Sequence, residues 1–405
     1  MVQTLQLVSL CCRNGKSVFV YQTDNQQNGR QIRQGCHYSQ RHAYIGMNPS
    51  CSDDDDLLDD SGSTVALPQV RAFFLNAGTQ GANNANIAFY APNGGADFIG
   101  DIFQKQNKAK LGDLGQTMIE YNECMYVAVY GSNYLVKLNA AGVEQTRASF
   151  VDDPDLAAGI RAIAAEDGYI YASFYGGVVA KINANTLKVE KKLAIENGYN
   201  LEGVAISNNM LYVANSYKQV DGKWVYLNDV FVVDLATFTL KEKLAVATNP
   251  NVLMEEDDKI FLIAWDYSFV EEGYVLQIID PANSNEVTNI GHATYMAADD
   301  DVVYLINSLT NWNVNPAVTT NHFSTYNIKT KTLNQSSFLK DDAPKELATT
   351  STSMLQVNDD NGDIYIGTTY FAAGNGNIYR FKKDGTFIER FDCGGQNPNS
   401  AVFFN

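Results

Sequence analysis

One pattern recurs along the chain at intervals of about 40 to 60 residues: a short apolar strand that opens on an aromatic residue. The six occurrences are Tyr126–Tyr130, Tyr171–Tyr175, Tyr212–Asn215, Phe261–Trp265, Tyr304–Asn307 and Tyr365–Thr369. Each is preceded by another apolar strand, and most are followed by a strand that ends on Asn or Asp. A single unit of this kind cannot bury its own apolar faces, so neighbouring units must pack on one another. Units of four short strands are typical of β-propeller blades.

The unit 201–246 shows the predicted strand order most clearly. We expect strands at 203–207, 210–215, 229–235 and 240–246, with Asn208-Asn209 forming the first turn because Asn tolerates positive φ. The same order fits 115–151, 158–195, 248–290, 292–339 and 352–393, which gives six complete blades.

Two incomplete units remain, one near each end of the sequence. Residues 397–404 resemble the start of the unit at 249–253 and predict an innermost strand with nothing after it. Residues 70–75, 86–90 and 97–103 predict the other three strands of a blade with nothing before them. Joined, they make a seventh blade and leave no free sheet edge. We therefore predict an all-β fold, a seven-bladed β-propeller over 69–405 whose ring is closed by the C-terminal strand.

The first 68 residues differ from the repeats. Residues 1–50 are rich in Gln, Asn, Arg and Cys without periodicity, and we expect a disordered or misread segment. Their apolar runs are too short for a signal-peptide core or a membrane span. Residues 51–68 begin with Cys51 and a run of four aspartates, which predicts an acidic tether.

Charge and cysteine spacing exclude several classes of function. The chain has 46 acidic and 29 basic side chains, a formal net charge of −17, and no compensating basic stripe, so we expect no nucleic-acid partner. No Cys/His spacing suits a metal, and we predict no metal and no cofactor. The three tryptophans are too few and too irregular for a quinone-dependent dehydrogenase.

The repeats carry a family resemblance. Leu201-Glu-Gly-Val-Ala-Ile206 and Leu211-Tyr-Val-Ala-Asn215 resemble YncE-like seven-bladed propellers. The stretch 103–116 (FQKQNKAKLGDLGQ) resembles the opening of a Bacteroidetes subset of surface lipoproteins, and Cys51-Ser52-Asp53 resembles the start of such a mature lipoprotein. The resemblance implies lipidation at Cys51, so that only a lipid anchor contacts the membrane, and display on the extracellular face of the outer membrane. A disordered acidic linker in a cytoplasmic protein is the alternative.

The resemblance also suggests a ligand and a partner. The wider group includes cobalamin-capturing propellers that sit on outer-membrane vitamin B12 transporters. It therefore implies capture of a small molecule, with a corrinoid as the analogy, for a TonB-dependent outer-membrane receptor. A metal-dependent hydrolase of the lactonase kind, with Glu202, Asn251 and Asn399 at the channel mouth, and an adhesive or protein-binding surface propeller remain alternatives.

The loops predict where a ligand binds. In a propeller the loops between the second and third strands share one face with the connections between blades. Here these loops, at 216–228, 266–273, 308–321 and 369–377, are long and aromatic, and long ordered loops are usually functional. The candidate ligand-binding residues are Tyr130, Arg161, Tyr175, Glu202, Tyr217, Trp224, Trp265, Tyr267, Trp312 and Tyr370. Packing between blades is the alternative for Tyr130, Tyr175 and Trp265, and a mutual ion pair is the alternative for Arg161 and Glu202. We predict no catalytic residue.

Overall fold

A computed structural model describes residues 7–13, 16–21, 57–92, 98–267 and 272–404 of the chain. It divides into two compact units, Met1–Asp54 and Asp55–Asn405. In the first unit, β1 (Leu7–Arg13) and β2 (Lys16–Tyr21) pair as an antiparallel hairpin.

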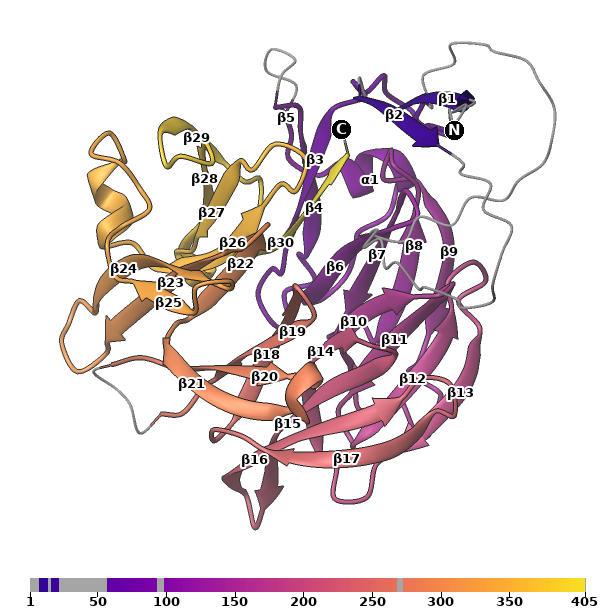
Figure 1. Cartoon of the computed structure of the whole chain (residues 1–405), viewed down its shortest axis with the longest axis vertical. Coiled ribbons are helices and arrows are strands. Elements are labelled where there is room, and N and C mark those ends of the chain that lie inside the picture. The colour runs from indigo at the N-terminus through magenta and orange to yellow at the C-terminus, as the bar shows by residue number, and fades with distance from the viewer. Residues whose placement is uncertain (1–6, 14–15, 22–56, 93–97, 268–271, 405) are drawn as a thin grey trace, which may run out of the picture. The chain divides into compact units, whose positions relative to one another are not determined.

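The second unit is the predicted seven-bladed β-propeller, a ring of seven four-stranded antiparallel sheets (Figure 1). Blade 1 contains β30 (Pro398–Phe404), β3 (Arg71–Asn76), β4 (Asn86–Tyr90) and β5 (Phe98–Ile99). Blade 2 contains β6 (Gly115–Tyr121), β7 (Cys124–Val129), β8 (Tyr134–Leu138) and β9 (Glu144–Ser149). Blade 3 contains β10 (Ile160–Glu166), β11 (Tyr169–Phe174), β12 (Val178–Asn183) and β13 (Val189–Ala194). Blade 4 contains β14 (Asn200–Ser207), β15 (Met210–Val220), β16 (Lys223–Asp234) and β17 (Thr239–Ala245).

The remaining three blades follow the same order from the centre outwards. Blade 5 contains β18 (Pro250–Glu256), β19 (Lys259–Ala264), β20 (Val275–Asp280) and β21 (Glu286–His292). Blade 6 contains β22 (Tyr295–Asp299), β23 (Val302–Asn311), β24 (Val318–Asn327) and β25 (Thr332–Asn334). Blade 7 contains β26 (Thr352–Val357), β27 (Ile364–Thr368), β28 (Asn377–Phe381) and β29 (Phe387–Asp392). Short 3-10 turns lie at Pro281–Asn283, Lys345–Ala348 and Phe371–Ala373.

The core lies between the blades. Seven clusters of buried apolar residues occur in the described part of the chain, and each joins one blade to the next. The recurring aromatic residue of each second strand belongs to these clusters, as at Tyr126, Tyr212 and Tyr365, all at most 1% exposed. The Tyr126 hydroxyl also donates to the Ala184 carbonyl of the next blade at 2.9 Å. The repeat in the sequence is therefore the residue that wedges each blade against its neighbour.

The ring closes as predicted, through strands from the two ends of the propeller sequence. β30 pairs antiparallel with β3, with Phe404 opposite Arg71 and Val402 opposite Phe73. The Phe404 ring meets the Phe73 ring edge-on, with centroids 5.9 Å apart. Blade 1 is thus completed by a strand more than three hundred residues distant in sequence from its neighbour.

The fourth strand of blade 1 differs from the prediction. We expected it over 97–103, but β5 covers only Phe98–Ile99 and is followed by the helix α1 (Ile102–Asn107). The Asp101 carboxylate accepts a hydrogen bond from the Gln104 backbone N–H and caps this helix. Ile102 and Phe103 then reach the core from a helical turn, because both are completely buried there.

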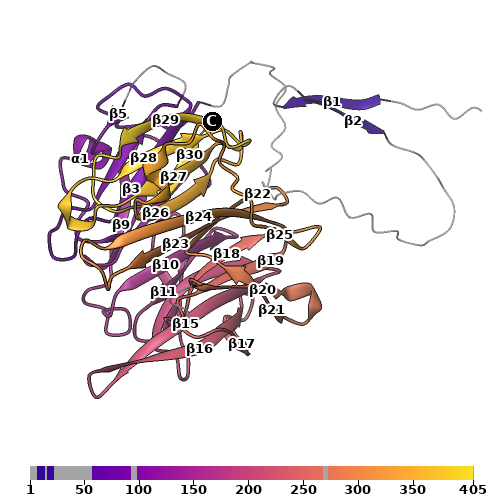
Figure 2. The same cartoon turned by 90° about the vertical axis from the view of Figure 1, so that its left-hand side faces the viewer.

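Two of the predicted loops are β-hairpins. Residues 216–228 continue β15 and β16, which stay paired as far as Val220 opposite Lys223 around the Asp221-Gly222 turn. Both turn residues have positive φ, as a tight two-residue hairpin requires. Residues 308–321 likewise continue β23 and β24 as far as Asn311 opposite Val318. Figure 2 shows the β15–β16 pair extending beyond the rest of its blade.

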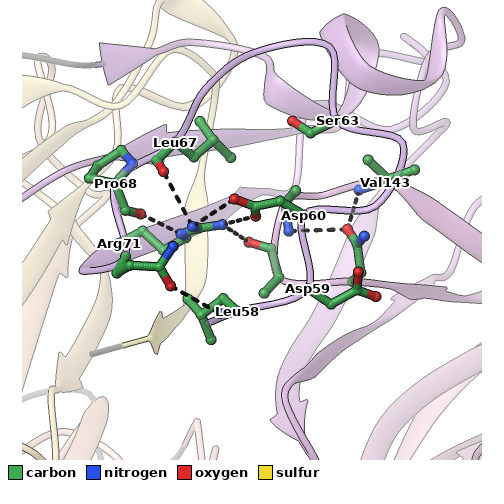
Figure 3. A network of polar contacts seen from close by, with 12 residues as sticks. Leu58, Asp59, Asp60, Ser63, Leu67, Pro68, Arg71 and Val143 are labelled. Carbon is green, nitrogen blue, oxygen red and sulfur yellow. Dashed lines mark hydrogen bonds and ion pairs between the residues drawn. The ribbon is translucent and has the colours of Figure 1, made fainter. Parts of the chain in front are cut away.

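Residues 57–68 form a strap that packs on the ring (Figure 3). The Arg71 guanidinium is fully buried and donates to the Asp60 carboxylate at 2.6 Å, to the Ala140 carbonyl at 2.8 Å and to the Pro68 carbonyl at 2.7 Å. Leu58, Val65 and Leu67 cover the apolar cluster between blades 1 and 2. This part of the predicted tether is therefore fixed to the propeller, whereas residues 51–56, with Cys51, lie outside the described residues.

Candidate functional site

The candidate face carries an aromatic belt, which we define as the ring-to-ring contacts that run across blades 2 to 5. Neighbouring ring centroids lie 5.5 Å apart for Tyr130 and Tyr175, 5.9 Å for Tyr175 and Tyr217, and 4.9 Å for Tyr217 and Trp224. Tyr217 is opposite Tyr226 across the hairpin, and the belt continues through Tyr226–Tyr267, Tyr267–Tyr274 and Tyr274–Trp265 contacts. All three tryptophans of the described residues lie on this face.

Most of the candidate residues on blades 2 to 4 form one group around Arg161. Its guanidinium lies over the Tyr130 and Tyr175 rings at 4.6 and 4.7 Å and pairs with Glu202 at 2.8 Å. The Glu202 carboxylate also accepts the Tyr175 hydroxyl at 2.5 Å. Arg161 and Glu202 are thus the mutual pair that we gave as the alternative, but their side chains are only 14% and 7% exposed, so this is no surface ion pair.

The environment of this group explains its electrostatics. Burial, and next the Glu202 charge, raise the pKa of Tyr175 far above its ordinary value, so its hydroxyl stays protonated and acts as a donor. Because Arg161 is neutralised by Glu202 and covered by two rings, little of its charge remains for an anionic ligand. A shallow cavity of about 420 Å³ lies beside this group, between Tyr130, Tyr175, Tyr199, Tyr217 and Trp224.

A second cavity, of about 500 Å³, lies over blades 5 to 7, and we name it the Trp312 cavity. Its lining residues are Asp266, Tyr267, Gly273, Tyr274, Thr294, Tyr295, Ser308, Leu309, Thr310, Trp312, Ser351, Thr352, Ser353, Thr369, Phe371 and Asn397. They come from connections between blades and from the ends of inner and second strands, so the cavity opens on the predicted face. Trp312 follows β23, is 67% exposed, and its ring lies 5.7 Å from that of Phe371.

Thr352, one of the residues that line the Trp312 cavity, has a buried hydroxyl without a partner in the described part of the chain. Thr352 is only 4% exposed, and its Oγ1 has no hydrogen-bond partner among the described residues. The same holds for the neighbouring Ser353 Oγ. Other hydroxyls of the lining are engaged, as where Thr319 contacts Thr310 and Ser351 at 2.8 and 2.9 Å. A buried polar group without a partner costs free energy, so Thr352 is suited to a hydrogen bond with a ligand.

The structure places the sequence-predicted residues in two groups. Tyr130, Tyr175, Tyr217 and Trp224 line the 420 Å³ cavity, whereas Tyr267 and Trp312 line the Trp312 cavity. Arg161 and Glu202 are in contact with Tyr175. Trp265 stacks on Tyr274 with centroids 5.6 Å apart, and Tyr370 precedes the lining residue Phe371. Trp224 lies on β16 rather than in a loop, yet it is 55% exposed and outside the blade core, as expected.

Sequence reasoning missed the hydroxyls of the lining and two of the aromatic walls. Tyr274, Tyr295 and Thr352 lie next to or at the beginning of regular strands, where an aromatic or β-branched residue is normally explained by packing. No local pattern distinguishes them from core residues. Their convergence depends on the curvature of the ring, which brings three blades to one point.

The opposite ends of the inner strands are acidic. Glu166, Glu256 and Asp299 terminate β10, β18 and β22. Burial, followed by the Glu255 and Asp359 charges, raises the pKa of Glu256 to about 7. Within the described ranges, no group of three or more His, Cys, Asp and Glu residues is arranged to hold a metal ion. No helix of the described residues has the length and apolar character needed to cross a membrane.

Comparison with known proteins shows likeness in fold. No family model matches the sequence, and no curated protein matches it significantly. A hypothetical selenium-binding protein from Sulfolobus tokodaii superimposes with a TM-score of 0.59 at 12% identity, over 84% of this chain and 94% of its own. A quinoprotein alcohol dehydrogenase-like protein from Bacteroides thetaiotaomicron superimposes with a TM-score of 0.56 at 16% identity, over 82% of this chain and 78% of its own. At identities this low, the similarity shows a shared fold and nothing about function. The fold of this chain is a seven-bladed β-propeller.

Proposed function

We propose that this propeller is a binding protein without catalytic turnover, which holds a small molecule in the Trp312 cavity. The observation that carries the proposal is the buried, unpartnered Thr352 hydroxyl in the lining of an aromatic-walled cavity. Small-molecule sites usually have about 300–1,000 Å³, mostly apolar walls and a few placed polar groups. The cavity, at about 500 Å³, has these properties.

The setting that we propose is capture at the cell surface. The sequence resemblance and the acidic run after Cys51 support a lipid-anchored protein on the extracellular face of the outer membrane, which passes its ligand to a TonB-dependent receptor. The strap at 57–68 is consistent with this proposal, because the anchored chain would meet the ring at a fixed point near Asp60. By analogy with the wider group, a corrinoid is the first ligand to test.

A binding screen tests the proposal. The purified protein is titrated with corrinoids, haem, siderophores and glycans, and tryptophan fluorescence reports binding. Truncation of an aromatic anchor typically costs about 2 kcal/mol, or roughly thirtyfold in affinity. We expect this loss for Trp312→Ala with an unchanged melting temperature, because Trp312 is exposed. Val151→Ala is the control, because Val151 is also exposed and lines neither cavity.

Binding of a protein partner is the second candidate, because exposed aromatic residues gather on this face. Trp224, Tyr226, Tyr267, Trp312, Tyr370 and Phe371 are each between 41% and 67% exposed. Large exposed apolar patches often mark interaction sites. A screen without any small ligand, together with capture of a purified receptor that Trp224→Ala abolishes, would favour this candidate. The lactonase alternative gains no support from Glu202, whose carboxylate is held by Arg161 and Tyr175.

A further inference from the structure

We infer that the ligand of the Trp312 cavity is an uncharged, polyhydroxylated molecule of the saccharide class. The inference rests on the proposed function, since it names the chemistry of the ligand at the same site. Three independent properties of the lining lead to it: charge, hydrogen-bonding capacity and the nature of the walls.

The charge of the lining excludes a strongly anionic ligand. Among the sixteen described residues of the lining, Asp266 is the only one with a carboxylate, and none is Lys, Arg or His. A carboxylate or phosphate taken into this cavity would lose its hydration without a cation to pair with. The net charge of −17 adds a long-range repulsion for anions. A neutral ligand meets neither cost.

The hydrogen-bonding groups of the lining match hydroxyl groups on a ligand. Seven of the lining residues are Ser or Thr, namely Thr294, Ser308, Thr310, Ser351, Thr352, Ser353 and Thr369. The hydroxyls of Thr294, Thr310, Ser351 and Thr369 already have protein partners, so Ser308, Thr352 and Ser353 offer the remaining capacity. A hydroxyl both donates and accepts, so a group of hydroxyls serves a partner that also does both. Thr352 and Ser353 both line the cavity, and the Thr352 Oγ1 and Ser353 Oγ atoms are buried and have no partner among the described residues.

The walls of the cavity supply apolar faces. Trp312 and Phe371 lie on one side with their rings tilted by 58°, and Tyr267 and Tyr274 meet edge-to-face with centroids 5.9 Å apart. Aromatic rings bury a large area with few rotors to freeze, and Tyr adds a polar edge. A pyranose ring presents an apolar C–H face and a rim of hydroxyls, which is the amphipathic shape that these walls and these hydroxyls complement.

The size of the cavity suits a short oligosaccharide. Its volume of about 500 Å³ lies within the usual range of small-molecule sites. Trp312 and Tyr267 are both exposed lining residues, so a longer sugar chain can extend beyond the cavity.

The test compares neutral and acidic saccharides on the full chain. A panel of neutral oligosaccharides (gluco-, manno-, galacto- and xylo-oligosaccharides) and of oligogalacturonides of the same length is titrated by calorimetry and tryptophan fluorescence. We expect at least one neutral series to bind, and the oligogalacturonides to bind at least tenfold more weakly. Thr352→Val keeps the shape and removes the hydroxyl, so affinity should fall about tenfold with an unchanged melting temperature. Trp312→Ala should reduce affinity about thirtyfold, and Val151→Ala, at an exposed residue that lines neither cavity, should leave it unchanged.

The outcomes separate this inference from the proposed function. If a corrinoid or an anionic ligand binds in a manner that depends on Trp312 while no neutral saccharide binds, the saccharide assignment is wrong and the proposed function stands. If no small molecule binds in that manner, both are wrong. Neutral-saccharide binding that Thr352→Val and Trp312→Ala leave unaffected also overturns the assignment, because the site then lies elsewhere.

Discussion

Removal of residues 398–405 should open the propeller ring. β30 supplies the innermost strand of blade 1 and is the partner of β3, which is otherwise paired only with β4. Without β30, the inner edge of β3 loses a complete row of backbone hydrogen bonds and becomes a free edge. Free, apolar edges of this kind promote association between molecules.

The magnitude follows from the residues that β30 buries. Val402 and Phe404 are 4% and 5% exposed, and burial of a Val or Phe side chain contributes about 1.5–3 kcal/mol. The two together contribute roughly 5 kcal/mol, before the strand hydrogen bonds are counted. Since folded proteins are stable by only about 5–15 kcal/mol, the truncation removes a large part of the total. The single change Phe404→Ala should cost about 3–5 kcal/mol.

The assay is thermal and urea unfolding of the parent, Phe404→Ala and the truncated protein at one scan rate, with size-exclusion chromatography. Val151→Ala is the control, because Val151 is 53% exposed and such surface changes stay within about 0.5 kcal/mol. We expect the melting temperature and the free energy of unfolding to fall from the parent to Phe404→Ala and further to the truncated protein. We also expect the truncated protein to form aggregates in size-exclusion chromatography. A truncated protein with an unchanged melting temperature and solubility would show that β30 does not hold the ring closed.

Three further predictions concern other parts of the chain. Arg71→Ala should cost about 3 kcal/mol in unfolding experiments, because it breaks the ion pair with Asp60 and leaves the Pro68 and Ala140 carbonyls without this donor. Asp60→Asn should cost less, because an amide oxygen still accepts a hydrogen bond from Arg71, which also keeps both carbonyl contacts; equal costs would contradict this reasoning. The pKa of Glu256 is about 7 in the folded protein, against an ordinary 4.5. Between these two pH values the folded state binds a proton at this group that the unfolded state does not, so the free energy of unfolding rises as pH falls from about 7 to 4.5. Melting temperatures at pH 5 and pH 8 should differ less in Glu256→Gln than in the parent, and an unchanged difference would refute the assignment. Expressed behind an intact signal peptide, the protein should incorporate labelled palmitate and be cleaved by protease on whole cells, and Cys51→Ala should abolish the labelling; labelling that persists would rule out Cys51 as the anchor.

The repeat made the fold predictable, because one wedge residue recurs in every complete blade. Tyr126, Tyr212 and Tyr365 each lie near the start of a second strand and pack against the next blade, so six blades could be inferred without any structure. The hairpin at Asp221-Gly222 was missed, because we predicted a long loop over 216–228. The Asp-Gly dipeptide is a strong turn signal that could have indicated it.

The site was only partly predictable. Exposed aromatics such as Trp312 are visible in a sequence because they interrupt polar stretches. The role of Thr352 is not visible, because nothing in the local sequence shows that its hydroxyl is buried, without a partner among the described residues, next to a cavity. Likewise, the Arg161–Glu202 pair could be proposed from strand position, but its burial between two tyrosine rings requires the completed ring.

The closure of blade 1 by β30 also has a consequence during synthesis. The ribosome makes β3, β4 and β5 before any other strand of the ring and β30 after all of them. At about 5–20 residues per second, the inner edge of β3 waits tens of seconds for its partner. Blades 2 to 7 can form in turn as they emerge, but the ring cannot be sealed until the last strand is released. The nascent chain therefore carries an unpaired β edge throughout, and a chaperone that covers this edge would raise the yield of closed propeller.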